Sequence, residues 1–402
     1  MKTAVKQRAG ACGMLLSVGA ALALGGAAMT ACEDEVTKQR PRSGAGQGAQ
    51  EPGEEFDPDT EDPSGPPAAD AGGLCGNRIH QVEIAEAPNI YFVLDASGSM
   101  LSPASSSSNA TRYDRVHDAA VDLVRNLGPL INVGAAVFPL DATDEAPCRP
   151  GGEVFAVTPG APFAGGQEGS TTTSRFRAAT RAAPLGGTPT AATLAALTPK
   201  LVDLPGKTIV VLATDGGPNC NSSASCEADG CIANIEQQCP DPEENCCSPL
   251  GPSGPEGCLD RDDTVAAIER LAASGIEVYV VGIPGSEFYG DVLDQMALAG
   301  GAAQFVSPFY FKVDDLDTLG NVLSKIASIV VSCEFDLVDP PPEAGQTNVY
   351  LDDELVAYDP ENGWRWKSPA VVELLGEACT KLKSGRVGQV QIVSGCPTEV
   401  AR

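Results

Sequence analysis

Basic residues, histidines and aromatic residues are all scarce in this chain of 402 residues. It has 26 Lys and Arg against 54 Asp and Glu, and its formal net charge is −28. A chain this acidic is repelled by nucleic-acid phosphates, so we exclude nucleic acid as a partner. Its 2 histidines, His80 and His117, are expected on the surface. The chain therefore offers few groups that could act as a general base for a serine nucleophile near neutral pH.

Long apolar runs are also lacking. The apolar stretch at 14–28 falls short of the ~20 residues that a membrane-spanning helix needs. It follows three basic residues and precedes Met29-Thr30-Ala31-Cys32, an order typical of a secretory signal peptide. The tetrapeptide is similar to the bacterial lipobox, with Met in place of the usual Leu. This resemblance implies that residues 1–31 are removed and that a lipid on Cys32 anchors an exported protein in the membrane of the cell envelope. The outer membrane or cell surface is favoured over the inner membrane, and plain secretion is the alternative.

Composition divides the rest of the chain into three parts. Residues 32–74 are rich in Glu, Asp, Pro and Gly, which predicts a disordered acidic tether. Residues 75–332 have a globular pattern and form the expected main domain, interrupted by a Cys-rich insert at 218–260. Residues 333–402 contain alternating apolar stretches and 2 Trp, which indicates a small Cys-containing β extension.

Apolar runs alternate with amphipathic stretches through the main domain. The sequence predicts strands at 90–94, 133–138, 209–213, 276–281 and 304–306. It predicts helices at 111–127, 190–201, 264–273, 291–299 and 314–330. Strands that alternate with helices indicate an α/β domain with a Rossmann-like, mostly parallel sheet flanked by helices. A weaker strand at 153–158 is expected at an edge, antiparallel to its neighbour.

Polar side chains follow the most apolar predicted strands. Asp95-Ala96-Ser97-Gly98-Ser99 comes directly after the first strand, and Asp215 comes just after the strand at 209–213. Thr188 lies between them in a Gly-rich segment that precedes a helix. In parallel sheets, ligands bind beyond the carboxyl ends of the strands, so we expect these groups to converge there. The set contains oxygen ligands only, which suits a hard cation such as Mg²⁺ or Mn²⁺.

These segments resemble the metal-ion-dependent adhesion site of von Willebrand factor type A (VWA) domains. The resemblance covers residues 86–331, and five positions match the motif in order and strand context. They are Asp95, Ser97, Ser99, Thr188 and Asp215. It implies a VWA fold in which the three hydroxyls bind Mg²⁺ or Mn²⁺ directly and the acids bind directly or through water. It also implies that an open coordination position takes an acidic residue of a partner protein, as in metal-dependent adhesion. A metal-dependent hydrolase and a structural envelope protein without metal are the alternatives.

Fourteen cysteines are present, and twelve remain besides Cys32 once residues 1–31 are removed. In an exported protein this even number predicts disulfides rather than a zinc–thiolate cluster, which is the alternative. The insert holds seven of them, an odd number, so at least one pairs outside it; Cys148 is our candidate. We expect Cys75–Cys333 to join the ends of the main domain and Cys379–Cys396 to close the extension.

Replacing Cys32 tests the predicted anchor. Cys32→Ser should release the protein from membranes into the soluble fraction, because the variant has no sulfur to carry the lipid. Fractionation and immunoblotting of cells that express each form would measure this. A variant that remains membrane-bound and uncleaved would show that the protein is not a lipoprotein.

Overall fold

The computed structural model describes residues 78–80, 82–84, 87–161, 171–384 and 387–401. The predicted signal peptide, the lipid on Cys32, the tether at 32–74 and Cys75 lie outside these ranges. Within them, no helix has both the length and the apolar character that crossing a membrane requires.

Six strands form the main sheet, in the order β5-β4-β3-β6-β7-β8. Neighbouring strands are parallel except for β5, which pairs antiparallel with β4 at one edge. The strands are β3 (Asn89–Asp95), β4 (Asn132–Phe138), β5 (Gly152–Pro159), β6 (Thr208–Thr214), β7 (Glu277–Gly282) and β8 (Phe311–Lys312). The predicted α/β class, the mostly parallel sheet and the antiparallel edge strand are all confirmed.

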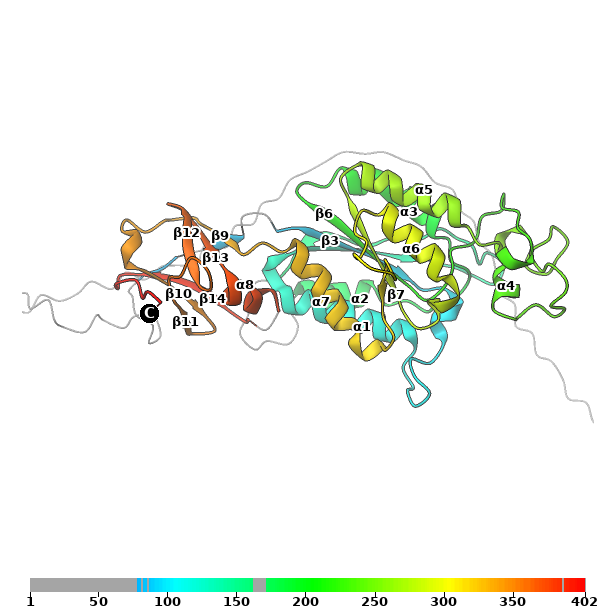
Figure 1. Cartoon of the computed structure of the whole chain (residues 1–402), viewed down its shortest axis with the longest axis horizontal. Helices are drawn as coiled ribbons and strands as arrows, with labels where there is room; N and C mark the ends of the chain where they lie inside the picture. The colour runs from blue at the N-terminus through cyan, green and yellow to red at the C-terminus, as the bar shows by residue number, and fades with distance from the viewer. Residues whose placement is uncertain (1–77, 81, 85–86, 162–170, 385–386, 402) are drawn as a thin grey trace, which may run out of the picture. The chain divides into compact units, whose positions relative to one another are not determined.

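Helices cover both faces of this sheet (Figure 1). One layer consists of α1 (Arg112–Leu127), α2 (Thr171–Ala179) and α7 (Leu319–Val330). The other consists of α3 (Thr190–Val202), α5 (Arg261–Ala273) and α6 (Gly290–Ala299). Alternate residues of β3 serve the two layers: Ile90 and Phe92 pack with the first, and Tyr91 and Val93 with the second. Burial on both faces explains why the central strands are continuous apolar runs.

Two elements of the main domain differ from the sequence prediction. The strand expected at 304–306 is wrong: Phe305 and Val306 are exposed, and the chain pairs with β7 later, through Phe311. Phe311 is buried against Tyr279, and this packing explains why the strand forms at Phe311 rather than at 304–306. Helix α2 was not predicted, because its sequence has little apolar periodicity. Phe176 packs this helix against the sheet: the centroid of its ring lies 5.7 Å from that of Phe92 and 5.5 Å from that of Phe155.

The C-terminal β extension contains two four-stranded antiparallel sheets, β1-β14-β10-β11 and β12-β13-β9-β2. Their C-terminal elements are β9 (Glu334–Leu337), β10 (Thr347–Leu351), β11 (Glu354–Val356), β12 (Trp364–Ser368), β13 (Val371–Leu374), α8 (Gly376–Lys383) and β14 (Val390–Ser394). The strands β1 (Arg78–His80) and β2 (Val82–Ile84) lie within the range 75–332 that we expected for the main domain, but they pair with β14 and β9. A three-residue strand is too short to show a period, so its partner is fixed by long-range pairing.

Disulfides hold the Cys-rich insert, which contains one short helix, α4 (Ile232–Ile235), and turns. The predicted link from Cys148 into the insert is confirmed as Cys148–Cys220. The other bridges inside the insert are Cys226–Cys258, Cys231–Cys247 and Cys239–Cys246. The sulfurs of Cys226, Cys247 and Cys258 lie close together, but all three are disulfide-bonded. Because zinc needs thiolates, this contradicts the alternative of a zinc–thiolate cluster.

The pairing expected for the remaining cysteines is wrong. Cys333 bonds to Cys379, with a Cα–Cα distance of 5.7 Å, and Cys396 is also disulfide-bonded. The reason is that α8 brings Cys379 beside the start of β9, so the bridge lies within the extension rather than across the main domain.

Both histidines are buried, with 4% of each exposed, so the expected surface positions are wrong. His80 lies in β1, where Nδ1 is 2.6 Å from the carbonyl oxygen of Asp339 and Nε2 is 2.8 Å from the Ser394 hydroxyl. His117 is on the side of α1 that meets α2, and its Nε2 is 3.0 Å from the carbonyl oxygen of Arg177. We expected His117 on the surface because we did not predict α2, the helix that covers this side of α1.

Burial, and secondarily the positive charge of Arg78, lowers the pKa of His80 below its usual value. In the unfolded chain His80 titrates near 6.5, so below that pH the unfolded state binds a proton that the folded state does not. The free energy of unfolding should therefore fall as the pH drops from about 6.5 through the folded pKa. An NMR titration of the imidazole protons, assigned with His80→Gln, should give a midpoint below 6.5. A midpoint at or above 6.5 would contradict this environment.

Candidate metal centre

The predicted site lies where the strand order of the main sheet reverses. From β3 the chain passes to β4 on one side and later returns to β6 on the other, so β3 and β6 are neighbours whose following loops diverge. Ligands of open α/β sheets bind in the crevice that this reversal creates at the carboxyl ends of the strands. Asp95 is the last residue of β3, and Asp215 directly follows β6.

The loop after β3 is folded around the Asp95 carboxylate. The backbone N–H of Ser97 donates to Oδ1 of Asp95 over 2.8 Å, the local turn for which Asp is suited. The hydroxyl of Thr214, at the end of β6, donates to Oδ2 over 2.5 Å. This arrangement places the hydroxyl oxygens of Ser97 and Ser99 3.1 Å apart, on the same loop.

The Asp215 carboxylate has a partner on each oxygen. The hydroxyl of Ser99 donates to Oδ1 over 2.6 Å, so the loops after β3 and β6 are joined at the site. Nη1 of Arg112, the first residue of α1, donates to Oδ2 over 2.6 Å. The Asp215 side chain is fully buried, whereas 21% of the Arg112 side chain is exposed.

Thr188 reaches the same place on a third loop. The backbone N–H of Gly98 donates to the carbonyl of Gly186, which ties this loop to the loop after β3. Asn219 holds Thr188 on both sides: its Oδ1 accepts from the Thr188 N–H over 2.6 Å, and its own N–H donates to the Thr188 carbonyl. A methyl group on Gly216 would lie 3.8 Å from Ser99 Oγ and 4.0 Å from Thr188 Oγ1, so the two hydroxyls face one spot.

All five residues predicted from the sequence thus come together. Asp95, Ser97, Thr188 and Asp215 are buried and Ser99 is half-buried. The hydroxyl of Thr188 makes no hydrogen bond with any residue that the structure describes. Three residues of the site, Arg112, Thr214 and Asn219, were not predicted. Thr214 adjoins Asp215 in the sequence, but no sequence signal places Arg112 or Asn219 here, since packing alone brings them in.

Two buried acids so close together are electrostatically unfavourable. Burial, and then the charge of Asp215, raises the pKa of Asp95. Burial also raises the pKa of Asp215, although the Ser99 and Arg112 hydrogen bonds oppose this. A divalent cation near both carboxylates would offset the unfavourable burial, and the available donors are all oxygens. The residues therefore fit Mg²⁺ or Mn²⁺, with Ser97, Ser99 and Thr188 as neutral ligands and the two Asp as charged ones.

The insert is built against the Thr188 loop. A Cβ on Gly187 would lie 2.5 Å from Sγ of Cys220 and 2.9 Å from Oδ1 of Asn219, which shows how closely the Cys148–Cys220 bridge packs there. Large apolar side chains are also exposed on the loop after β3, on the Thr188 loop and on the loop after β7. They are Leu101, Leu185 and Phe288.

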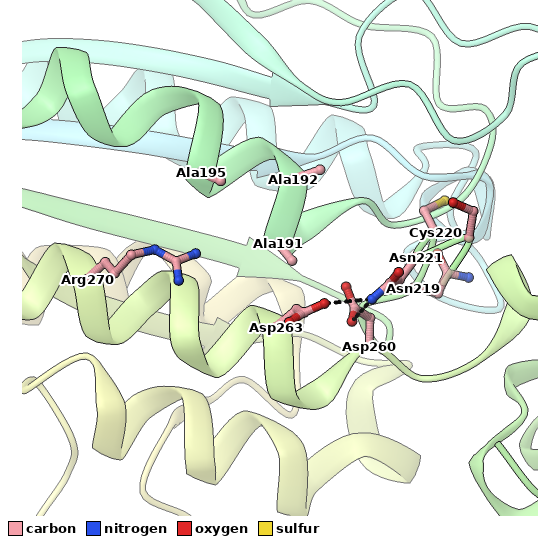
Figure 2. Close-up of a pocket in the computed structure, with 10 residues that line it drawn as sticks. Ala191, Ala192, Ala195, Asn219, Cys220, Asn221, Asp260, Asp263 and Arg270 are labelled. Carbon is pink, nitrogen blue, oxygen red and sulfur yellow. Dashed lines mark hydrogen bonds between the residues drawn. The ribbon is translucent and has the colours of Figure 1, made fainter. Parts of the chain in front are cut away.

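A hollow lies between α3 and α5, at the base of the insert (Figure 2). Nδ2 of Asn221 donates to Asp260 over 3.0 Å and to Asp263 over 2.7 Å. Asp260 is buried, and burial raises its pKa. Small Ala side chains of α3 line the other wall. Through these two hydrogen bonds Asn221 ties the insert to the start of α5.

No family model and no curated protein matches the chain. Solved structures to which parts of this chain are similar include the pilus adhesin SpaC from Lactobacillus rhamnosus GG in its open conformation, at 16% identity and a TM-score of 0.45. That match covers 79% of this chain and 39% of SpaC. The vWF domain of a type V pili tip protein from Porphyromonas gingivalis matches at 13% identity and a TM-score of 0.39, over 61% of this chain and 95% of that domain. BatB from Bacteroides thetaiotaomicron matches at 15% identity and a TM-score of 0.35, over 60% and 99%.

Gly187→Ala tests whether the insert positions Thr188. The added methyl group would press on Cys220 and Asn219, and Asn219 holds the Thr188 backbone. Disturbing groups that orient metal ligands weakens metal binding by roughly 10–100-fold, so we expect a drop of that size in Mn²⁺ affinity by calorimetry. The control is Gly320→Ala, in α7, where a methyl group meets nothing within 4 Å. Equal Mn²⁺ affinity in both variants would show that the insert does not support the site.

Proposed function

We propose that this chain is an envelope-anchored protein with a VWA-like domain that binds Mg²⁺ or Mn²⁺ and uses the cation to hold an acidic residue of a partner protein. The observation that carries the proposal is the convergence of five oxygen-bearing side chains from three loops on one end of the sheet. Two of them are carboxylates, Asp95 and Asp215, buried side by side.

The composition of the ligand set favours recognition of a carboxylate. Ser97, Ser99 and Thr188 are neutral, so only the two Asp among the five ligands reduce the positive charge of the cation. Mg²⁺ keeps several waters in protein sites, and an incoming carboxylate can replace one of them. The long-range field of a chain with net charge −28 repels an acidic partner, but it is screened beyond ~8 Å in physiological salt. The attraction must therefore come from the cation itself at short range.

The surroundings of the site favour a protein as the partner. Leu101 lies two residues after Ser99, Leu185 directly precedes the Gly-rich segment of Thr188, and Phe288 follows β7; all three are exposed. Phe is among the residues enriched at protein interfaces, and apolar contacts around a binding residue exclude water from it.

The two alternatives have less support. A hydrolase that used Ser97 or Ser99 as its nucleophile would need a base beside the hydroxyl. Both histidines are hydrogen-bonded elsewhere, and no described lysine or histidine bonds to either serine. In a purely structural role without metal, Arg112 on Asp215 would be the one cationic side chain that compensates the two buried carboxylates among the described residues.

Calorimetric titration with MgCl₂ and MnCl₂ tests the proposal. We expect the wild type to bind one cation and Asp215→Ala to bind it at least tenfold more weakly, because one of the two charged ligands is gone. The control is Asp144→Ala, an exposed acid in the loop after β4, which should bind as the wild type does. Circular dichroism checks that all three remain folded. A wild type that binds neither ion at millimolar concentration would overturn the proposed function.

A further inference from the structure

Arg112 contributes the only cationic side chain that contacts the five-residue site among the described residues. Its Nη1 lies 2.6 Å from Oδ2 of Asp215, on the oxygen that Ser99 does not use. The pair is largely shielded from water, since the Asp215 side chain is fully buried and 21% of the Arg112 side chain is exposed. Screening of this pair is therefore much weaker than for ion pairs at the surface.

The fold holds Arg112 in this position from several sides. Thr111 and Asp114 form a reciprocal capping box that fixes the first turn of α1, where Arg112 is the first residue. Gly285, at φ +115°, lies so close to the guanidinium that a Cβ there would be 2.4 Å from Nη1 of Arg112 and 3.0 Å from the carbonyl oxygen of Asp215. A cation at a helix N-terminus is unfavourable with respect to the helix dipole, so Asp215 rather than the helix accounts for the placement of this charge.

We propose that Arg112 is a built-in counter-cation of Asp215 that weakens divalent-cation binding and strengthens the hold of the loaded site on a partner's carboxylate. This inference rests on the proposed function. The two carboxylates alone would neutralise a divalent cation, which would leave little attraction for a third. With the guanidinium included, the loaded site carries one net positive charge within an otherwise acidic chain. Arg112 thus lowers the affinity of the site for the cation and raises the affinity of the loaded site for a carboxylate.

A purely structural role for Arg112 makes the opposite prediction. If Arg112 only positioned Asp215, its removal would disorder a ligand and weaken cation binding, as loss of orienting groups does. If it acts as a competing charge, its removal strengthens cation binding, because the repulsion between guanidinium and cation disappears. The sign of the change in cation affinity therefore separates the two roles.

The experiment is calorimetric titration of the full chain with MnCl₂, comparing the wild type with Arg112→Gln and Arg112→Lys. We expect the dissociation constant to fall roughly tenfold or more in Arg112→Gln, and to stay near the wild-type value in Arg112→Lys, which keeps the charge. The control is Arg125→Gln, which removes a charge from the exposed Arg125–Asp122 pair at the other end of α1 and should change nothing. Weaker Mn²⁺ binding in a folded Arg112→Gln overturns the inference.

Acetate provides a second readout. With the site loaded with Mn²⁺, water-proton relaxation should report displacement of a bound water by acetate, and Arg112→Gln should need several-fold more acetate than the wild type. Equal acetate affinity in the wild type and Arg112→Gln overturns the claim that Arg112 strengthens carboxylate binding.

If Arg112→Gln fails to fold, the Mn²⁺ affinity of Arg112→Lys decides the question. An affinity at the wild-type level supports a role through charge, and a tenfold loss contradicts it. Absence of Mn²⁺ binding in the wild type and every variant overturns the proposed function itself, an outcome distinct from those above.

Discussion

The burial of two carboxylates at one end of the main sheet is the constraint on which the rest of the site depends. Asp95 and Asp215 occupy the ends of neighbouring strands, so the strand order itself brings two like charges together. Such a pair is unfavourable unless hydrogen bonds and positive charge compensate it. The hydroxyls of Thr214 and Ser99, the Ser97 N–H and the Arg112 guanidinium supply part of that compensation. A divalent cation would supply the remainder, and we propose that the site binds metal for this reason.

The Cys-rich insert adjoins the site and contacts two of the loops around it. It leaves the sheet directly after Asp215 and is closed by covalent bonds, because its sequence has too few apolar residues for a core of its own. The Cys148–Cys220 bridge packs against the Thr188 loop, and Asn219 next to it holds the Thr188 backbone. Tyr289 donates to Glu236 of the insert over 2.6 Å, which joins it to the loop after β7. The insert therefore both supports the ligands and stands beside the face that we propose for partner binding.

Much of this organisation could be predicted from the sequence, because it depends on short-range patterns. The continuous apolar runs that become β3 and β6 locate the buried parallel strands, and the polar residues that end them locate the site. The rest depends on long-range contacts. Arg112 and Asp215 are 103 residues apart, and only the packing of α1 against the main sheet brings them together. The strand β1, the buried position of His80 and the Cys333–Cys379 bridge likewise follow from pairing across the C-terminal extension, which no local pattern encodes.

The central claim is that the loops after β3 and β6 and the Thr188 loop form one cation site. Anomalous diffraction from crystals grown with MnCl₂ tests it most directly, since the scattering locates the ion without reference to any activity. The account predicts a single strong peak among the hydroxyl oxygens of Ser97, Ser99 and Thr188, beside the Asp95 and Asp215 carboxylates. A peak at Asp260 and Asp263 in the hollow at the base of the insert, with none at the Ser97–Ser99 loop, would contradict it.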